Sequence, residues 1–174
     1  RACVVGLAVA CSACGRLEFA THASSDSNDQ PTDVAVDAAT TPLTACLQPL
    51  GSVASQLLAH SQSVAIAPPL AVVGFSDGPQ GIQVVDISNP NAPALRGTLL
   101  TSTGPAALAP TDNDVLSVTI RGNLAYLATY TGGLVIVDIA NPNAPTFVGG
   151  LDLPSETWGL ASTGSHVLAA NYQL

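Results

Sequence analysis

A segment of thirteen residues occurs twice in this chain of 174 residues, and no other feature constrains its fold as strongly. Gly81 to Pro93 reads Gly-Ile-Gln-Val-Val-Asp-Ile-Ser-Asn-Pro-Asn-Ala-Pro, and Gly133 to Pro145 repeats nine of these residues at a spacing of 52. The similarity extends upstream and downstream of both copies. A period of about 40 to 50 residues is typical of arrays of small β-sheets such as propellers. We therefore expect each copy to mark one structural unit.

Each unit should form four short strands separated by turn residues. The expected strands are 63–66, 70–75, 81–87 and 94–99 in the first unit, and 115–120, 124–130, 133–139 and 146–151 in the second. The third strand of the second unit, 134–139, is almost continuously apolar, which predicts burial on both faces. A partial third unit begins at Trp158 and matches the first two strands, whereas Gly51-Ser-Val53 matches only the outermost strand of a unit.

These units predict an all-β fold, a partial β-propeller of four-stranded antiparallel blades over residues 43–174. A parallel sheet with covering helices would need amphipathic segments of about ten or more residues between the strands, and the chain lacks them. Two full blades and part of a third cannot close a ring, which takes about four to eight. We therefore expect the sequence to be part of a longer protein.

The composition agrees with short strands and excludes one class of partner. Only 9% of residues are charged and 47% are hydrophobic, and the formal net charge is −8. A nucleic-acid-binding protein needs a basic surface to neutralise phosphates, and this chain has four Lys and Arg in total. We expect no nucleic-acid partner.

Residues 1–14 are typical of an export signal. The apolar run from Val4 to Ala10 is too short to span a bilayer but suits the apolar core of a signal peptide. Small residues lead into Cys11 and Cys14, as in the bacterial lipobox, whose cysteine is acylated. A lipobox usually has Leu three residues before the cysteine, and here Ala8 or Cys11 occupies that place, so both cysteines remain candidates. A zinc site at Cys11-x-x-Cys14 lacks a second ligand pair.

Residues 15–42 are expected to be a disordered acidic linker. The segment from Ser24 to Thr41 contains four aspartates and no aromatic residue that could anchor a core. Its Asp spacing lacks the glycine and terminal glutamate of an EF-hand calcium loop. With the signal and the blades, this linker divides the chain into residues 1–14, 15–42 and 43–174.

The repeat itself resembles a known family. Gly133-Leu-Val-Ile-Val-Asp-Ile, followed by Asn-Pro and preceded by Gly122-Asn-Leu-Ala-Tyr-Leu-Ala, is similar to the LVIVD repeat, and the resemblance covers about 43–174. It implies an exported bacterial or archaeal propeller, often a surface protein. Together with the signal it implies a lipoprotein at the outer membrane or cell surface, or otherwise a periplasmic or extracellular protein.

The recurring polar residues of the repeat are interpreted as turn formers. An aspartate ends each apolar strand before Asn-Pro, where its carboxylate can accept backbone N–H groups of the turn. A catalytic or metal-binding carboxylate pair is the alternative. The structural turn residues are Asp86, Asn89, Pro90, Asp138, Asn141 and Pro142. We predict no catalytic residue, cofactor or metal ligand.

Two interpretations of function remain. The first is a non-enzymatic interaction module, held on the lipid membrane by an N-terminal acyl anchor, whose ligand is a protein or a glycan. Trp158 and Tyr130 could form a carbohydrate-stacking surface or pack within a blade, and the loop from Leu100 to Asn113 is an insertion suited to contact a ligand. The alternative is an exported propeller hydrolase or lactonase with a channel site completed by missing blades. The innermost strands, taken as 63–66, 114–118 and 158–160, offer one carboxylate, Asp114, which favours the binding module.

Overall fold

The computed structural model of the protein describes residues 4–10, 47–55, 59–104, 113–153 and 155–172, and side chains only from Leu50 onward. Residues 51–174 belong with Arg1–Gly6 to one compact unit, and Leu7–Leu50 belong to a second. No helix in these described ranges has the length and apolarity to cross a membrane. The expected linker at 15–42 lies outside the described residues.

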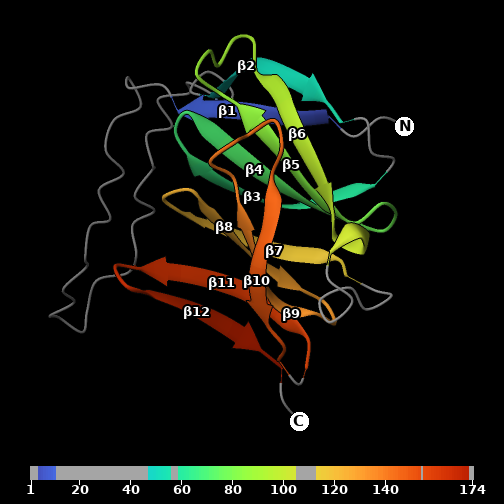
Figure 1. Cartoon of the computed structure of the whole chain (residues 1–174). Helices are drawn as coiled ribbons and strands as arrows, with labels where there is room; N and C mark the ends of the chain where they lie inside the picture. Colours follow the sequence, from blue (N-terminus) through green and yellow to red (C-terminus); the bar gives the residue numbers. More distant parts are fainter. Residues whose placement is uncertain (1–3, 11–46, 56–58, 105–112, 154, 173–174) are drawn as a thin grey trace, which may run out of the picture. The chain divides into compact units, whose positions relative to one another are not determined.

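The first repeat forms a four-stranded antiparallel sheet, called blade 1 from here on (Figure 1). Its strands follow one another as a meander in the order β3-β4-β5-β6, so each connection is a short turn between neighbours. Val, Ile and Leu alternate with smaller residues along them, as a pleated strand with two covered faces requires. The strands are β3 (His60–Ala67), β4 (Leu70–Ser76), β5 (Gly81–Asp86) and β6 (Ala94–Leu100).

The second repeat, blade 2, has the same four-stranded order, and a hairpin of two strands follows it. The hairpin is β11 (Thr157–Thr163) and β12 (His166–Asn171). All-β architecture with four-stranded antiparallel units is thereby confirmed, and the expected strands are all present. Blade 2 consists of β7 (Val115–Arg121), β8 (Leu124–Thr129), β9 (Gly133–Asp138) and β10 (Thr146–Leu151).

The largest core lies between the two blades. One face of blade 1 and one face of blade 2 bury their aliphatic side chains against each other in a single cluster. The first strand of blade 2, β7, contacts both β3 and β11, so the first strands of successive units lie next to one another, as the inner strands of a propeller do. The fully buried members are Val72, Ile82, Val84, Val115, Ala125, Val135 and Val137.

The expectation that residues 134–139 are buried on both faces was only half right. Val135 and Val137 are fully buried against blade 1, but Leu134 and Ile136 on the opposite face are half-buried. The strand β5 of blade 1, at the equivalent place, is buried on both faces from Gly81 to Val85. The difference arises because blade 1 is followed by a complete sheet, whereas the described residues after blade 2 form only a hairpin.

The N-terminal strands form a separate two-stranded sheet of β1 (Val4–Ala10) and β2 (Leu47–Ala54). The apolar segment of the expected signal is thus a strand in this structure, while Cys11 and Cys14 lie outside the described residues. Gly51 on β2 approaches the turn between β5 and β6, where an added β-carbon would lie 2.6 Å from the carbonyl oxygen of Pro90 and from Cδ of Pro93.

The same contact recurs one unit later. Gly97 on β6 lies against the equivalent turn of blade 2, where an added β-carbon would collide with the carbonyl oxygen of Pro142 and with Cδ of Pro145. Each outer strand therefore needs a glycine where the Asn-Pro turn of the following unit packs on it. We call this arrangement the glycine–turn contact. It assigns β2 to the outer-strand position that the Gly51-Ser-Val53 match indicated.

Candidate functional site

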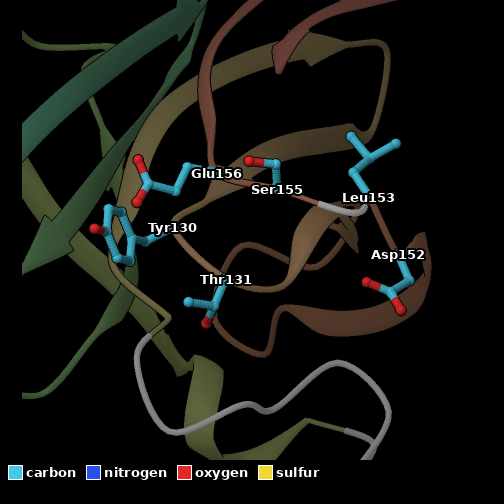
Figure 2. A pocket seen from close by; sticks show the side chains of 6 residues that line it. All are labelled: Tyr130, Thr131, Asp152, Leu153, Ser155 and Glu156. Atoms are coloured by element: carbon cyan, nitrogen blue, oxygen red, sulfur yellow. The ribbon is translucent and has the colours of Figure 1, made fainter. Parts of the chain in front are cut away.

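A pocket of about 340 Å³ lies where blade 2 meets the hairpin. It is formed by the turn 130–132, which joins β8 to β9, and by residues 152, 153, 155 and 156 of the connection from β10 to β11. Figure 2 shows the Glu156 carboxylate beside the Tyr130 ring, with the Asp152 carboxylate at the other side of the pocket. The lining residues are Tyr130, Thr131, Asp152, Leu153, Ser155 and Glu156.

A difference in loop length explains why this pocket is open. At the junction between the two blades, the loop 77–80 carries Gln80, whose Nε2 donates a 2.8 Å hydrogen bond to Oδ1 of Asp114. The Oε1 atom of Gln80 accepts a second bond, 2.8 Å long, from the backbone N–H of Asn113. Gln80 thus fills the space between the blades. The equivalent turn 130–132 is one residue shorter and has Gly132 at the place of Gln80, and the pocket lies beside it.

An aromatic pair lies at the site, and one of its members, Tyr130, lines the pocket. The rings of Tyr130 and Trp158 meet edge to face, with centroids 6.1 Å apart and an interplanar angle of 84°, a favoured geometry for aromatic side chains. The indole Nε1–H of Trp158 donates a 3.1 Å hydrogen bond to Oε2 of Glu156. Trp158 is nevertheless 55% exposed. Its indole is therefore held in place by two neighbours while much of its surface faces solvent.

The end of the hairpin holds Ser155 and Glu156 of this connection in place by hydrogen bonds. Nδ2 of Asn171 donates a 2.7 Å hydrogen bond to the carbonyl oxygen of Ser155, and the backbone N–H of Tyr172 donates a 2.8 Å bond to the carbonyl oxygen of Glu156. The backbone N–H of Tyr130 makes the equivalent bond to Asp114 in blade 2. The pocket wall is thus part of the regular blade structure.

The described pocket lining is acidic and rich in hydrogen-bond acceptors. Asp152 and Glu156 supply carboxylates, Thr131, Ser155 and Tyr130 supply hydroxyl groups, and no Lys or Arg belongs to the lining. Such a surface can accept hydrogen bonds from hydroxyl or amino groups and can place a ring against an aromatic side chain. It repels phosphate and carboxylate ligands because their charge has the same sign.

The turn residues of the repeat lie at the other end of the blades. Oδ1 of Asp86 accepts a 2.9 Å hydrogen bond from the backbone N–H of Ser88, and Oδ1 of Asp138 accepts a 2.8 Å bond from the N–H of Ala140. In the same way, Oδ1 of Asn89 accepts a hydrogen bond from the backbone N–H of Asn91, and Oδ1 of Asn141 accepts one from the N–H of Asn143. The turn containing Pro90 packs on Gly51 and the turn containing Pro142 packs on Gly97. The repeated polar residues therefore lie in turns away from the pocket.

Asp86 carries one additional interaction. Nη2 of Arg96 lies 2.6 Å from its Oδ2 atom, and this hydrogen-bonded ion pair, together with bonds from Ser88, lowers the pKa of Asp86 from 3.8 to about 2. Blade 2 has Val148 at the place of Arg96, so the ion pair is a feature of blade 1 alone among the described blades.

Sequence reasoning missed most of the pocket. It singled out Tyr130 and Trp158 but not Asp152 or Glu156. Its inner strands, 63–66, 114–118 and 158–160, included Asp114 but neither His60 nor Glu156. The first strand of each unit (β3, β7 and β11) has a bulge near its start. The residue at the equivalent place shortly before the bulge is His60, Asp114 and Glu156, respectively. Aligning the three units on their first strands would have revealed this recurring ionisable position.

These three ionisable residues do not gather into one metal-binding group. Among the described residues, no cluster of three or more His, Cys, Asp and Glu side chains could hold a metal ion. His60 lies 3.1 Å from Asp77 in an exposed pair instead. Of the loop from Leu100 to Asn113, only 100–104 and 113 are described, and Thr101–Thr103 form a short 3-10 helix, η2.

One comparison with known proteins, the match to a repeat family, agrees with the repeat structure. The LVIVD repeat family matches residues 60–101 and 113–152, which correspond to the two blades. A search of curated proteins finds no match. Among solved structures, the computationally designed Ika4 protein is 15% identical over 71% of this chain and 92% of that chain, with a TM-score of 0.35.

Proposed function

We propose, from the premise that this chain is an LVIVD-repeat protein folded as propeller-type blades, that it is an exported, non-enzymatic binding module whose pocket beside Trp158 takes a carbohydrate. The ligand class is neutral sugars or amino sugars. The observation that carries this proposal is the exposed indole of Trp158, which is fixed by Tyr130 and Glu156 at the edge of a pocket lined by hydroxyl and carboxylate groups.

The chemistry of the pocket supports a sugar over other small ligands. A sugar ring has an apolar face that stacks on an indole and several hydroxyl groups that donate to carboxylate oxygens. Asp152 and Glu156 line the pocket, and Trp158 adjoins it through its contacts with Glu156 and Tyr130, so one ligand that extends from the pocket onto the indole would make both kinds of contact. The volume of about 340 Å³ is at the lower end of the range for small-molecule pockets, roughly 300 to 1,000 Å³. This size favours one or two sugar rings.

The intrinsic fluorescence of the chain offers a direct test, because Trp158 is the only tryptophan in the sequence. Titrating the full chain with neutral, amino and acidic oligosaccharides should quench or shift the emission with saturation for the first two classes only. Glu156→Gln should weaken binding several-fold, because it removes the charged acceptor that also orients the indole. Val148→Ala, on an exposed residue of β10, is the matched control and should bind like the native protein.

Two results would contradict the proposal. One is the absence of saturable change with any sugar in the panel. The other is binding that Glu156→Gln and Asp152→Asn both leave unaltered, since a ligand elsewhere on the blades would not depend on these carboxylates. Preference for acidic sugars would likewise refute the electrostatic argument.

Export and membrane attachment belong to the same proposal. The signal segment within residues 1–14 would direct export. Acylation of Cys11 or Cys14 would attach the chain to the membrane, and the linker 15–42 would hold the blades away from the lipid surface of the outer membrane or cell. Without acylation the protein would be periplasmic or extracellular. In either setting the pocket would meet glycans of the envelope or the surroundings.

A second candidate function rests on the recurring position of His60, Asp114 and Glu156 at the starts of the first strands. Ionisable groups at this place in each blade could line the channel of an exported hydrolase or lactonase. Turnover of ester and lactone substrates by the full chain, lost in Asp114→Asn, would favour this candidate over the binding module.

A further inference from the structure

The dipeptide Asp77-Gly78 is the one place in this sequence where an aspartate or asparagine precedes a glycine. At such a pair the backbone nitrogen of the second residue can attack the side-chain carboxyl carbon of the first and close a five-membered succinimide ring. Glycine favours this attack because it has no β-carbon to hinder it and restricts the backbone least. Asp77 is therefore the aspartate of this chain that is most disposed to ring closure.

The structure leaves both reacting groups accessible. The side chain of Asp77 is 62% exposed, and its Oδ2 atom lies 3.1 Å from Nδ1 of His60, whose side chain is 79% exposed. Gly78 is exposed as well, and among the described residues no hydrogen bond engages its backbone N–H. Bringing this nitrogen to the carboxyl carbon therefore disturbs no buried side-chain contact of either residue.

The reaction needs no partner other than water. Ring closure joins the nitrogen of Gly78 to Cγ of Asp77 and releases one water molecule. Water then adds to either ring carbonyl and gives back aspartate or gives isoaspartate, in which the main chain runs through the former side chain. While the ring is closed, the Cα proton is acidic because Cα adjoins a ring carbonyl. Loss and return of this proton invert Cα, and opening of the inverted ring gives the D forms of both products.

The backbone conformation of Asp77 discriminates between the L and D products. Its φ angle is +55°, and it is the only described residue other than glycine with a positive φ. This left-handed region is disfavoured for L-residues because the β-carbon approaches the following carbonyl oxygen. A D-residue has the mirror-image preferences and adopts this region as its ordinary conformation. Inversion at Cα would therefore relieve strain at this position.

The anchoring of the loop 77–80 discriminates against isoaspartate. The backbone N–H of Asp77 donates a 3.1 Å hydrogen bond to Oδ1 of Asp114, and Nε2 of Gln80 donates a 2.8 Å bond to the same atom. Isoaspartate inserts one additional carbon into the main chain between these two donors and would displace Gln80 from its partners. D-Aspartate keeps the native length of the main chain, so both bonds can persist.

We propose that Asp77 is a site of spontaneous modification, at which the folded chain converts L-aspartate to D-aspartate through a succinimide formed with Gly78. Every ring-opened form can close again to the succinimide, so the form that the loop accommodates best accumulates with time. D-Aspartate combines the native length of the main chain with the preferred sign of φ. The modified chain retains the carboxylate and its charge.

Ageing of the full chain for several weeks at physiological temperature and neutral pH tests this site. Cleavage after Phe75 and Leu95 releases the peptide 76–95. Chromatography and mass spectrometry compare this peptide with four synthetic standards that carry L-aspartate, D-aspartate, L-isoaspartate or D-isoaspartate at position 77. The same peptide aged free in solution is the reference without a fold. We expect a D-aspartate fraction several-fold higher in the folded chain than in the free peptide, and a lower fraction of isoaspartate.

Two controls accompany the experiment. Asp77→Glu retains the carboxylate but would have to close a six-membered ring, which forms much more slowly, so position 77 should keep its L configuration. Asp86 lies in the same peptide, is followed by the bulky Ile87 and is paired with Arg96, so it should remain L-aspartate. Unaltered L-aspartate at position 77 of the aged chain would overturn the proposal. A product distribution equal to that of the free peptide would also overturn it, because the folded loop would then select no product.

Discussion

The side-chain amide of Gln80 donates a 2.8 Å hydrogen bond to the carboxylate of Asp114, and this bond joins a loop of blade 1 to the start of blade 2. The backbone N–H of Asp77 donates to the same carboxylate oxygen over 3.1 Å. One carboxylate thus holds both ends of the 77–80 loop. At the junction between blade 2 and the hairpin, Gly132 takes the place of Gln80, and the pocket lies there.

Gln80→Ala should therefore destabilise the contact between the blades. It removes the donor to Asp114 and the acceptor for the backbone N–H of Asn113, and the loss of such partly buried bonds costs about 1 to 3 kcal/mol. Chemical unfolding followed by circular dichroism measures the change. Gln62→Ala, on an exposed residue of β3, is the control and should unfold like the native chain. Equal stability of the two variants would show that the bridge contributes nothing.

Gly97→Ala and Gly149→Ala make a matched pair for the glycine–turn contact. The first substitution places a methyl group against Pro142 and Pro145, and the second places it in open space. Steric overlap in packed structure costs about 1 to 3 kcal/mol, so Gly97→Ala should lower the melting temperature by several degrees. Gly149→Ala should leave it within about one degree of the native value. Similar melting of both variants would contradict the contact.

Acid should weaken blade 1 through the Asp86–Arg96 pair. The pKa of Asp86 is lowered from 3.8 to about 2 in the folded chain. Because the folded value lies below the unfolded one, the stabilisation is complete above about pH 4 and is lost as the pH falls toward 2. Arg96→Gln should flatten the dependence of stability on pH in that window. Acid unfolding curves of native and variant protein that run parallel between pH 4 and 2 would refute this role.

Acylation is expected at Cys11 or Cys14. Metabolic labelling with an alkyne fatty acid in an expressing bacterium should label the chain, and the Cys11→Ser and Cys14→Ser variants identify the acceptor. Cys46→Ser is the control and should retain the label. Label and membrane fractionation that survive replacement of both candidate cysteines would show that the anchor assignment is wrong.

The periodic part of the fold could be predicted because each repeated residue acts locally. The turns at Asn89 and Asn141 and the strands between them depend on neighbours in the same unit, so two copies in the sequence suffice to place them. The pocket depends instead on the loop 130–132 being shorter than its counterpart and on how Tyr130 meets Trp158 across a unit boundary. Such contacts arise where the repeat is broken, and a pattern derived from the repeat does not contain them.

The glycine–turn contact also divides the surface of each blade into a fixed and a variable end. At the end where Gly97 packs on the turn of blade 2, any change of turn length or outer-strand residue would disturb two units at once. At the opposite end, the loops 77–80 and 130–132 already differ in length on the same framework. New recognition loops could therefore be grafted or could evolve at that end while the spacing between blades stays constant.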